Sequence, residues 1–150
     1  MKILALDLGT TTGWASEAGG ILTSGTICFS GRPKDHKGEK FRRFRAWLRD
    51  LIDKEKPEIV FYEDVKRHAG VLAAHAYGGY LGHVLAVLAS RGGIPIRGIG
   101  VSTIKKKATG RGNADKMAMV KAAINRWPDQ DILDDNQADA LWILETSKNL

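Results

Sequence analysis

Residues 2–8, KILALDL, are apolar at nearly every position except for one aspartate, Asp7. A continuous apolar run of this length is typical of a central strand that is buried on both faces. Such strands occur in sheets that carry helices on both sides. The run therefore favours an α/β domain, and it places a single carboxylate near the end of a buried strand.

The rest of the chain reads as strands followed by alternating helices and strands. We expect strands at 2–8, 13–17, 21–29, 58–63 and 94–100, helices at 38–55, 69–91, 114–126 and from residue 134 onward, and a basic loop at 101–116. The first three strands can form an antiparallel meander, and the later strands, each joined through a helix, must add in parallel. The sequence thus predicts a mixed five-stranded sheet with helices on both faces, in one domain spanning residues 1–150.

The formal net charge of +6 makes nucleic acid the first class of partner to consider. The alternative is a soluble protein with a mildly basic surface. The single cysteine, Cys28, excludes a disulfide framework within the chain and fits a reducing cytoplasm. We expect Cys28 to be a buried, inert thiol.

The stretch from residue 68 to residue 90 contains no Asp, Glu, Lys or Arg and is long enough to cross a bilayer. Internal histidines and glycines interrupt it, so we expect a helix of a soluble domain and no membrane span. Gly78, Gly79 and Gly82 would let a second helix approach closely. The helix at 69–91 therefore predicts a homodimer contact, with burial inside the monomer as the alternative.

Four carboxylates lie where a site is easily built. Asp7 and Glu63 end predicted strands, and strand ends in α/β sheets open onto the crevice where ligands bind. Asp135 and Asp139 are four residues apart, so both project from one face of the last helix. Carboxylates gathered at one point would repel unless a cation held them, and oxygen-only ligands suit Mg²⁺ or Mn²⁺. Taken singly, each has a structural explanation, such as a turn contact, a solvated strand end or a helix N-terminal acid.

Five segments, in this order, resemble the RuvC-type Holliday junction resolvases of the RNase H-like superfamily, in a compact form like those of phages. They are ALDLGTTTGWA, VFYEDV, the helix AAHAYGGYLGHVLAVLASRGGIPI, IKKKATGRGNADKMAMV and DDNQADAL. The resemblance covers nearly the whole chain and implies an RNase H-like fold.

The resemblance also implies an activity, which is paired nicking of four-way DNA junctions by a homodimer with Mg²⁺. Asp7, Glu63, Asp135 and Asp139 would hold two ions, with Mn²⁺ as a substitute. Lys116 matches a basic residue near the scissile phosphate. Contacts to branched DNA would come from the basic residues Lys66, Arg67, Lys105, Lys106, Lys107, Arg111 and Lys116. The expected location is the cytoplasm of a bacterial cell or of a phage-infected host.

The chain departs from the family pattern at three places. The turn LGTTTG after Asp7 is shorter than in cellular RuvC proteins. Lys66 stands where cellular members often carry a stacking aromatic residue, and Tyr62 or Tyr77 would be the substitutes. Many members space the last two acids three apart, which here gives Asn136, so Asp135 is our choice for the fourth acid and Asp134 is the reserve.

Three other functions remain open at this point. DLGTTTG also resembles the first phosphate loop of sugar kinases, actin and heat-shock ATPases, but those folds need two lobes around the nucleotide. A YqgF-like nuclease acting on RNA would share the metal site. A DNA-binding module without catalysis would keep the basic residues but would not need every acid.

Overall fold

One five-stranded sheet organises the computed structural model, which describes all 150 residues. Its strands are β1 (Ile3–Asp7), β2 (Thr11–Ala18), β3 (Ile21–Cys28), β4 (Ile59–Asp64) and β5 (Ile96–Gly100). They lie in the order β3-β2-β1-β4-β5. β1, β2 and β3 form an antiparallel meander, while β4 pairs in parallel with β1 and β5 in parallel with β4. The predicted mixed sheet is confirmed.

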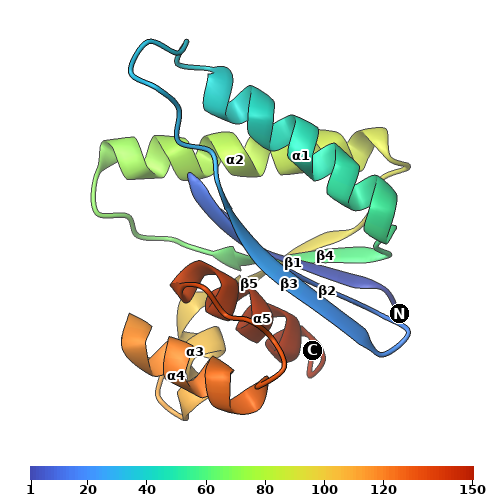
Figure 1. Cartoon of the computed structure of the whole chain (residues 1–150), viewed down its shortest axis with the longest axis vertical. Helices are drawn as coiled ribbons and strands as arrows, with labels where there is room; N and C mark the ends of the chain where they lie inside the picture. Colours follow the sequence, from blue (N-terminus) through green and yellow to red (C-terminus); the bar gives the residue numbers. More distant parts are fainter.

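Helices cover both faces of this sheet, as Figure 1 shows. α1 (Glu39–Glu55) and α2 (Val71–Ser90) lie on one face, and α3 (Val101–Thr109), α4 (Lys116–Arg126) and α5 (Asp135–Ser147) lie on the other. Successive side chains of a strand point to opposite faces. Leu4 and Leu6 of β1 therefore enter the core under α1 and α2, and Ala5 enters the core under α5.

The predicted basic loop at 101–116 is wrong for its first half, because residues 101–109 form helix α3. Ile104 anchors this helix in the core, and Gly110 ends it in the left-handed conformation that glycine adopts without strain. The consecutive lysines at 105–107 are typical of an exposed loop, but here they belong to a short amphipathic helix.

Cys28 is a second correction. The thiol is exposed rather than buried, because Cys28 is the last residue of the outer strand β3. The neighbouring Phe29 enters the core in its place.

α2 is the one helix that is long and apolar enough to cross a membrane, with a mean hydropathy of 1.4. One face of it, including Tyr80, Val84 and Leu88, is buried in the core beside α1, so protein and not lipid covers that side. The other face is open to solvent, and the side chains of Leu72 and Leu85 are 85% and 47% exposed. The helix is therefore only partly buried in the monomer.

Candidate active site

Three carboxylates from distant parts of the chain meet at one end of the sheet. Asp7 ends β1, Glu63 lies near the end of β4, and Asp139 lies on α5. Each offers one carboxylate oxygen, and these oxygens lie within 4.8 Å of one another. β1 and β4 are parallel neighbours, so their carboxyl ends share one edge of the sheet. Three of the four predicted acids are thus brought together.

The N-terminus of α5 is held firmly against the sheet. Asp134 caps the helix by accepting a hydrogen bond from the Gln137 backbone N–H at 2.8 Å. Its second oxygen accepts one from the Thr26 hydroxyl of β3 at 2.8 Å. At Gly13 of β2, an added Cβ would lie 1.8 Å from the Asn136 carbonyl oxygen, so only glycine lets the helix approach this closely. These contacts position Asp139 over the strand ends.

The electrostatics of the cluster favour a bound cation. Burial raises the pKa of Asp7 well above its usual range, and the charges of Asp139 and Glu63 raise it further. Burial, Glu63 and Asp135 raise the pKa of Asp139 to about 7, with Lys105 and Lys116 opposing the shift. Burial also raises the pKa of Glu63. Because each shift reflects the cost of keeping the acids ionised, a cation among them would stabilise the charged forms. The all-oxygen donor set therefore fits a hard divalent ion.

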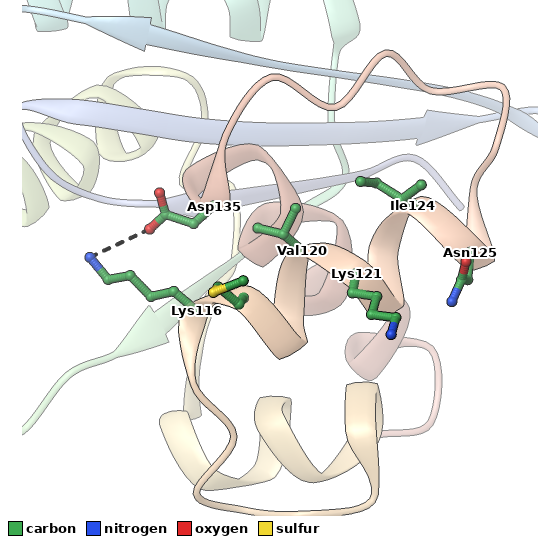
Figure 2. A pocket seen from close by; sticks show the side chains of 7 residues that line it. Lys116, Val120, Lys121, Ile124, Asn125 and Asp135 are labelled. Atoms are coloured by element: carbon green, nitrogen blue, oxygen red, sulfur yellow. Dashed lines mark ion pairs between the residues drawn. The ribbon is translucent and has the colours of Figure 1, made fainter.

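Asp135 lies beside this cluster but outside its three closest members. Its charge contributes to the raised pKa of both Asp7 and Asp139. Figure 2 shows its carboxylate facing Lys116, the first residue of α4, with the ammonium nitrogen 3.7 Å away. Lys116 is 85% exposed at its side chain, so the pair is loose and the lysine is free to contact another anion. Both residues line one end of an open groove along α4.

The other predicted basic residues divide into two groups. Lys105 of α3 acts on the site, since its charge lowers the pKa of Glu63 and of Asp139. Lys106 and Lys107 line a groove with Thr146 and Leu150 instead, at the far end of α5 from the acids. The exposed Arg111 follows α3 in the loop before α4. Helical geometry separates these lysines, because neighbouring residues of a helix point in different directions.

Lys66 and Arg67 lie exposed in the segment between β4 and α2. The ammonium of Lys66 pairs with the Asp64 carboxylate at 3.0 Å. Tyr77 of α2 secures the start of this segment, since its hydroxyl donates to the Glu63 carbonyl oxygen at 2.8 Å and accepts from the Val65 N–H. Tyr77 therefore fixes the backbone on either side of Asp64. It is not presented for stacking on a base.

Sequence reasoning missed what Gly13 and Asp134 do. The sequence makes Asp134 the reserve for the fourth acid, but both of its carboxylate oxygens accept hydrogen bonds that hold the helix. The spacing Asp134–x–x–Gln137 is that of a capping box, although the Gln137 side-chain oxygen accepts from the N–H of Leu133, the residue before the cap, at 2.9 Å. That signal was readable in the sequence. The close approach at Gly13 was not, because its partner Asn136 lies far along the chain.

No protein-family model matches the sequence, and no curated protein matches it by sequence. The structure, in contrast, superposes on Thermus thermophilus RuvC in complex with a Holliday junction substrate with a TM-score of 0.76, covering 97% of this chain and 92% of that one at 22% identity. This chain has the RuvC-type resolvase fold. A second structure of Thermus thermophilus RuvC matches with a TM-score of 0.74 at 23% identity and the same coverage.

The RuvC-type fold also relates the chain to Ydc2, the yeast mitochondrial Holliday junction resolvase. That match has a TM-score of 0.65 at 14% identity and covers 96% of this chain and 76% of Ydc2. At these identities the likeness is one of fold. The convergence of Asp7, Glu63 and Asp139 is an independent finding, made on this chain's own side chains.

Proposed function

We propose that this chain is a metal-dependent endonuclease that cuts four-way DNA junctions by hydrolysing phosphodiester bonds. The observation that carries the proposal is the meeting of Asp7, Glu63 and Asp139 within 4.8 Å, at the end of a RuvC-type sheet. Like charges at this distance repel and raise one another's pKa, so bringing the three acids together costs free energy. A purely structural role for all three would not explain why the fold accepts that cost.

The proposed cofactor is Mg²⁺, with Mn²⁺ as a substitute and two ions in each site. Asp7, Glu63 and Asp139 would hold the ions, and Asp135 is the proposed fourth ligand because it lies beside them and acts on their charge. When bound, such a pair of ions activates a water and stabilises the leaving oxygen of a phosphodiester. The acids would orient the ions, and the buried strand ends would fix the acids.

Lys116 is the proposed basic residue at the scissile phosphate. Its ammonium is exposed, and it faces the Asp135 carboxylate at the edge of the cluster. The ammonium would place a positive charge beside a phosphate oxygen bound there, close to the reacting bond. A positive charge in that position stabilises the negative charge that develops in the transition state. Lys105 would add a second positive charge near the acids, consistent with its effect on Glu63 and Asp139.

The proposed substrate is branched DNA, cut as a four-way junction by a homodimer. The similar protein from Thermus thermophilus was solved with a Holliday junction substrate, and the net charge of +6 suits a phosphate backbone. The open face of α2 supports the dimer, since Leu85 is 47% exposed and Gly78 and Gly82 have nothing within 4 Å of an added Cβ. Gly79 is excluded from this face, because it packs against the Phe41 ring of α1 in the same chain. A two-fold dimer would place two equal sites on a two-fold junction and so explain paired nicks.

The test is a nicking assay on a synthetic four-way junction with Mg²⁺, with Mn²⁺ and with chelator. We expect metal-dependent symmetric nicks from the natural chain, and a loss of at least about 100-fold in the Asp7→Asn variant, which keeps the size of the side chain but not its charge. A linear duplex and a structured RNA run beside the junction. Equal cutting of the RNA would favour a YqgF-like activity, and unchanged cutting by Asp7→Asn would refute the catalytic assignment.

A further inference from the structure

The positive charge of this chain is concentrated in residues 32–49, which we call the basic segment. It runs from the β3–α1 loop into α1 and contains eight of the 23 Lys and Arg residues but only two of the 17 Asp and Glu residues. Its formal charge thus equals the +6 of the whole chain, and the rest of the chain is electrically balanced. The eight cations are Arg32, Lys34, Lys37, Lys40, Arg42, Arg43, Arg45 and Arg49.

The two acids of the basic segment are already engaged. Glu39 pairs with Arg42 one helical turn away. Asp35 accepts a hydrogen bond from the Arg32 backbone N–H at 2.9 Å and lies 3.8 Å from the Arg43 guanidinium. Six cations are left without a carboxylate partner, and they are Arg32, Lys34, Lys37, Lys40, Arg45 and Arg49.

The position of these charges on α1 is unfavourable in the free protein. The N-terminus of a helix carries a partial positive charge, so cations in its first turns are repelled. Lys40, Arg42 and Arg43 all lie within the first five residues of α1. An anion bound to this end of the helix would remove that repulsion, because it would meet both the side chains and the helix dipole.

The loop that carries the first cations is held in one shape by its own hydrogen bonds. The His36 imidazole accepts from the Gly38 N–H at 2.9 Å, and the Glu39 N–H donates to the His36 carbonyl oxygen. The Arg43 guanidinium donates to the Phe29 carbonyl oxygen at 3.1 Å and ties α1 to the loop's first residues. The free cations are therefore presented from an ordered surface.

The basic segment starts at the same end of the sheet as the acidic cluster. Cys28, the last residue of β3, is paired with Thr11, and the Phe29 N–H donates to the Thr10 carbonyl oxygen in the turn that follows Asp7. Figure 1 shows the β3–α1 loop leaving this end of the sheet on the α1 and α2 side, with α3 and α4 on the opposite side. Lys105 and Lys116 lie on that opposite side. Cations thus lie on both faces of the sheet near the end that carries the acids.

We infer that the basic segment is a second DNA-binding surface, which holds the phosphate backbone of a substrate arm on the α1 side of the acidic cluster. This rests on the proposed function for the identity of the nucleic acid. The arrangement suits a branched substrate, whose arms leave the cutting point in different directions. Lys105, Lys116 and Arg111 would contact the strand at the acids, and the basic segment would contact an arm beyond them.

The experiment measures binding of a labelled four-way junction and of a linear duplex in EDTA, where no cutting occurs, over roughly 50 to 200 mM salt. The test variant is Lys34→Ala/Lys37→Ala. The matched control is Lys2→Ala/Lys54→Ala, which removes the same charge from exposed lysines at the opposite end of α1 and of β1. Fluorescence anisotropy gives the slope of log affinity against log salt for each protein.

We expect the slope of the test variant to be shallower by about 0.9 for each lost phosphate contact, or about 2 for the pair, and the slope of the control to equal that of the natural chain. A charge-keeping variant, Lys34→Arg/Lys37→Arg, should retain the natural slope. Equal slopes for the test and control pairs would overturn the inference. A slope as shallow in the Arg variant as in the Ala variant would also overturn it, because the loss would then come from a change of structure and not from lost charge.

Two further arms separate the possible failures. If the test pair leaves the DNA slope unchanged but abolishes binding to vesicles of anionic lipid, the basic segment serves a membrane surface and the inference is wrong. If the natural chain shows no metal-dependent cutting of the junction, the proposed function fails instead. In that case the slopes measured on the linear duplex still test whether the basic segment binds DNA, because phosphate contacts need no catalysis.

Discussion

Asp139 is the single residue whose ionisation most directly reports on the candidate site. Its pKa is raised from 3.8 to about 7, first by burial and then by Glu63 and Asp135. Between these two pH values the folded protein binds more protons than the unfolded chain. The free energy of unfolding of the metal-free protein therefore falls as the pH rises through this interval.

Replacing Asp139 by Asn should remove this pH dependence. In EDTA at pH 8 we expect the Tm of Asp139→Asn to lie a few degrees above that of the natural chain, at roughly 2–4 °C for each kcal/mol. At pH 4 the two should agree, because the natural carboxyl is then largely protonated. Mg²⁺ should raise the Tm of the natural chain alone. Thermal unfolding monitored by circular dichroism is the measurement, and a lower Tm for the variant at pH 8 would contradict the assignment.

Asp134 and Asp135 are adjacent and should behave oppositely. Asp134→Ala removes the cap of α5 and its bond to Thr26, so we expect a loss of at least about 1 kcal/mol in stability. Asp135→Asn should not lower the Tm, because it removes a charge that repels Asp7 and Asp139, but it should lower the rate of junction cutting. Denaturant unfolding and the nicking assay, run on both variants, separate the two roles. Full cutting by Asp135→Asn would remove it from the proposed ligand set.

At the scale of elements, the meeting of β2 and α5 decides whether the acids converge. The motif GTTTG resembles a phosphate-binding turn, but its last glycine serves a packing contact with the backbone of Asn136. The Thr12 hydroxyl of the same turn donates to the Gly9 carbonyl oxygen at 2.7 Å. Gly13, at the start of β2, is therefore the part of the motif that supports the helix carrying Asp139.

Gly13→Ala tests this packing. The added methyl would lie 1.8 Å from the Asn136 oxygen and 2.3 Å from its carbonyl carbon, and backbone atoms cannot rotate away. We expect a loss of about 1–3 kcal/mol or more in stability, together with weaker Mg²⁺ binding as Asp139 is displaced. Isothermal titration with Mg²⁺ and denaturant unfolding are the measurements. Gly70→Ala, where an added Cβ meets nothing within 4 Å, is the control: it should keep the natural Mg²⁺ binding and lose no more than about 1 kcal/mol, the cost of alanine at the N-cap of α2.

At the scale of the whole molecule, the open face of α2 is the feature that a monomer leaves unexplained. The helix carries no charged residue, and only one of its faces is buried. Apolar side chains exposed along one helix are typical of a surface that another protein covers. The proposed partner is a second copy of this chain.

Leu85→Glu should therefore turn a dimer into a monomer. The substitution places a charge on the outer face of α2, where the leucine is 47% exposed, so the monomer should fold normally. Ile21→Glu is the control, because Ile21 is 71% exposed at the β2–β3 hairpin, away from α2. Sedimentation velocity at micromolar concentration measures the state. A natural chain that sediments as a monomer would refute the dimer.

The sequence by itself determined the α/β class, the five strands and four of the five helices, and it named the candidate acids. These are local properties: the apolar run of residues 2–8 predicts a buried strand, and a carboxylate at its end marks Asp7. The start of the last helix was also local, because Asp134 and Gln137 form its cap. Helix α3 was missed because its lysines mask a short apolar face anchored by Ile104.

Only the tertiary structure decided which acids meet and which charges surround them. Asp7, Glu63 and Asp139 are brought within 4.8 Å by strand pairing and by the contact at Gly13, and neither is visible in local sequence patterns. In the same way, the charge of Lys105 lowers the pKa of Glu63 and of Asp139, while Lys106 lines a groove with Thr146 and Leu150, although the two lysines are neighbours in the chain. Local patterns depend on residues a few positions apart, whereas a site depends on distances that packing sets between segments far apart in the sequence.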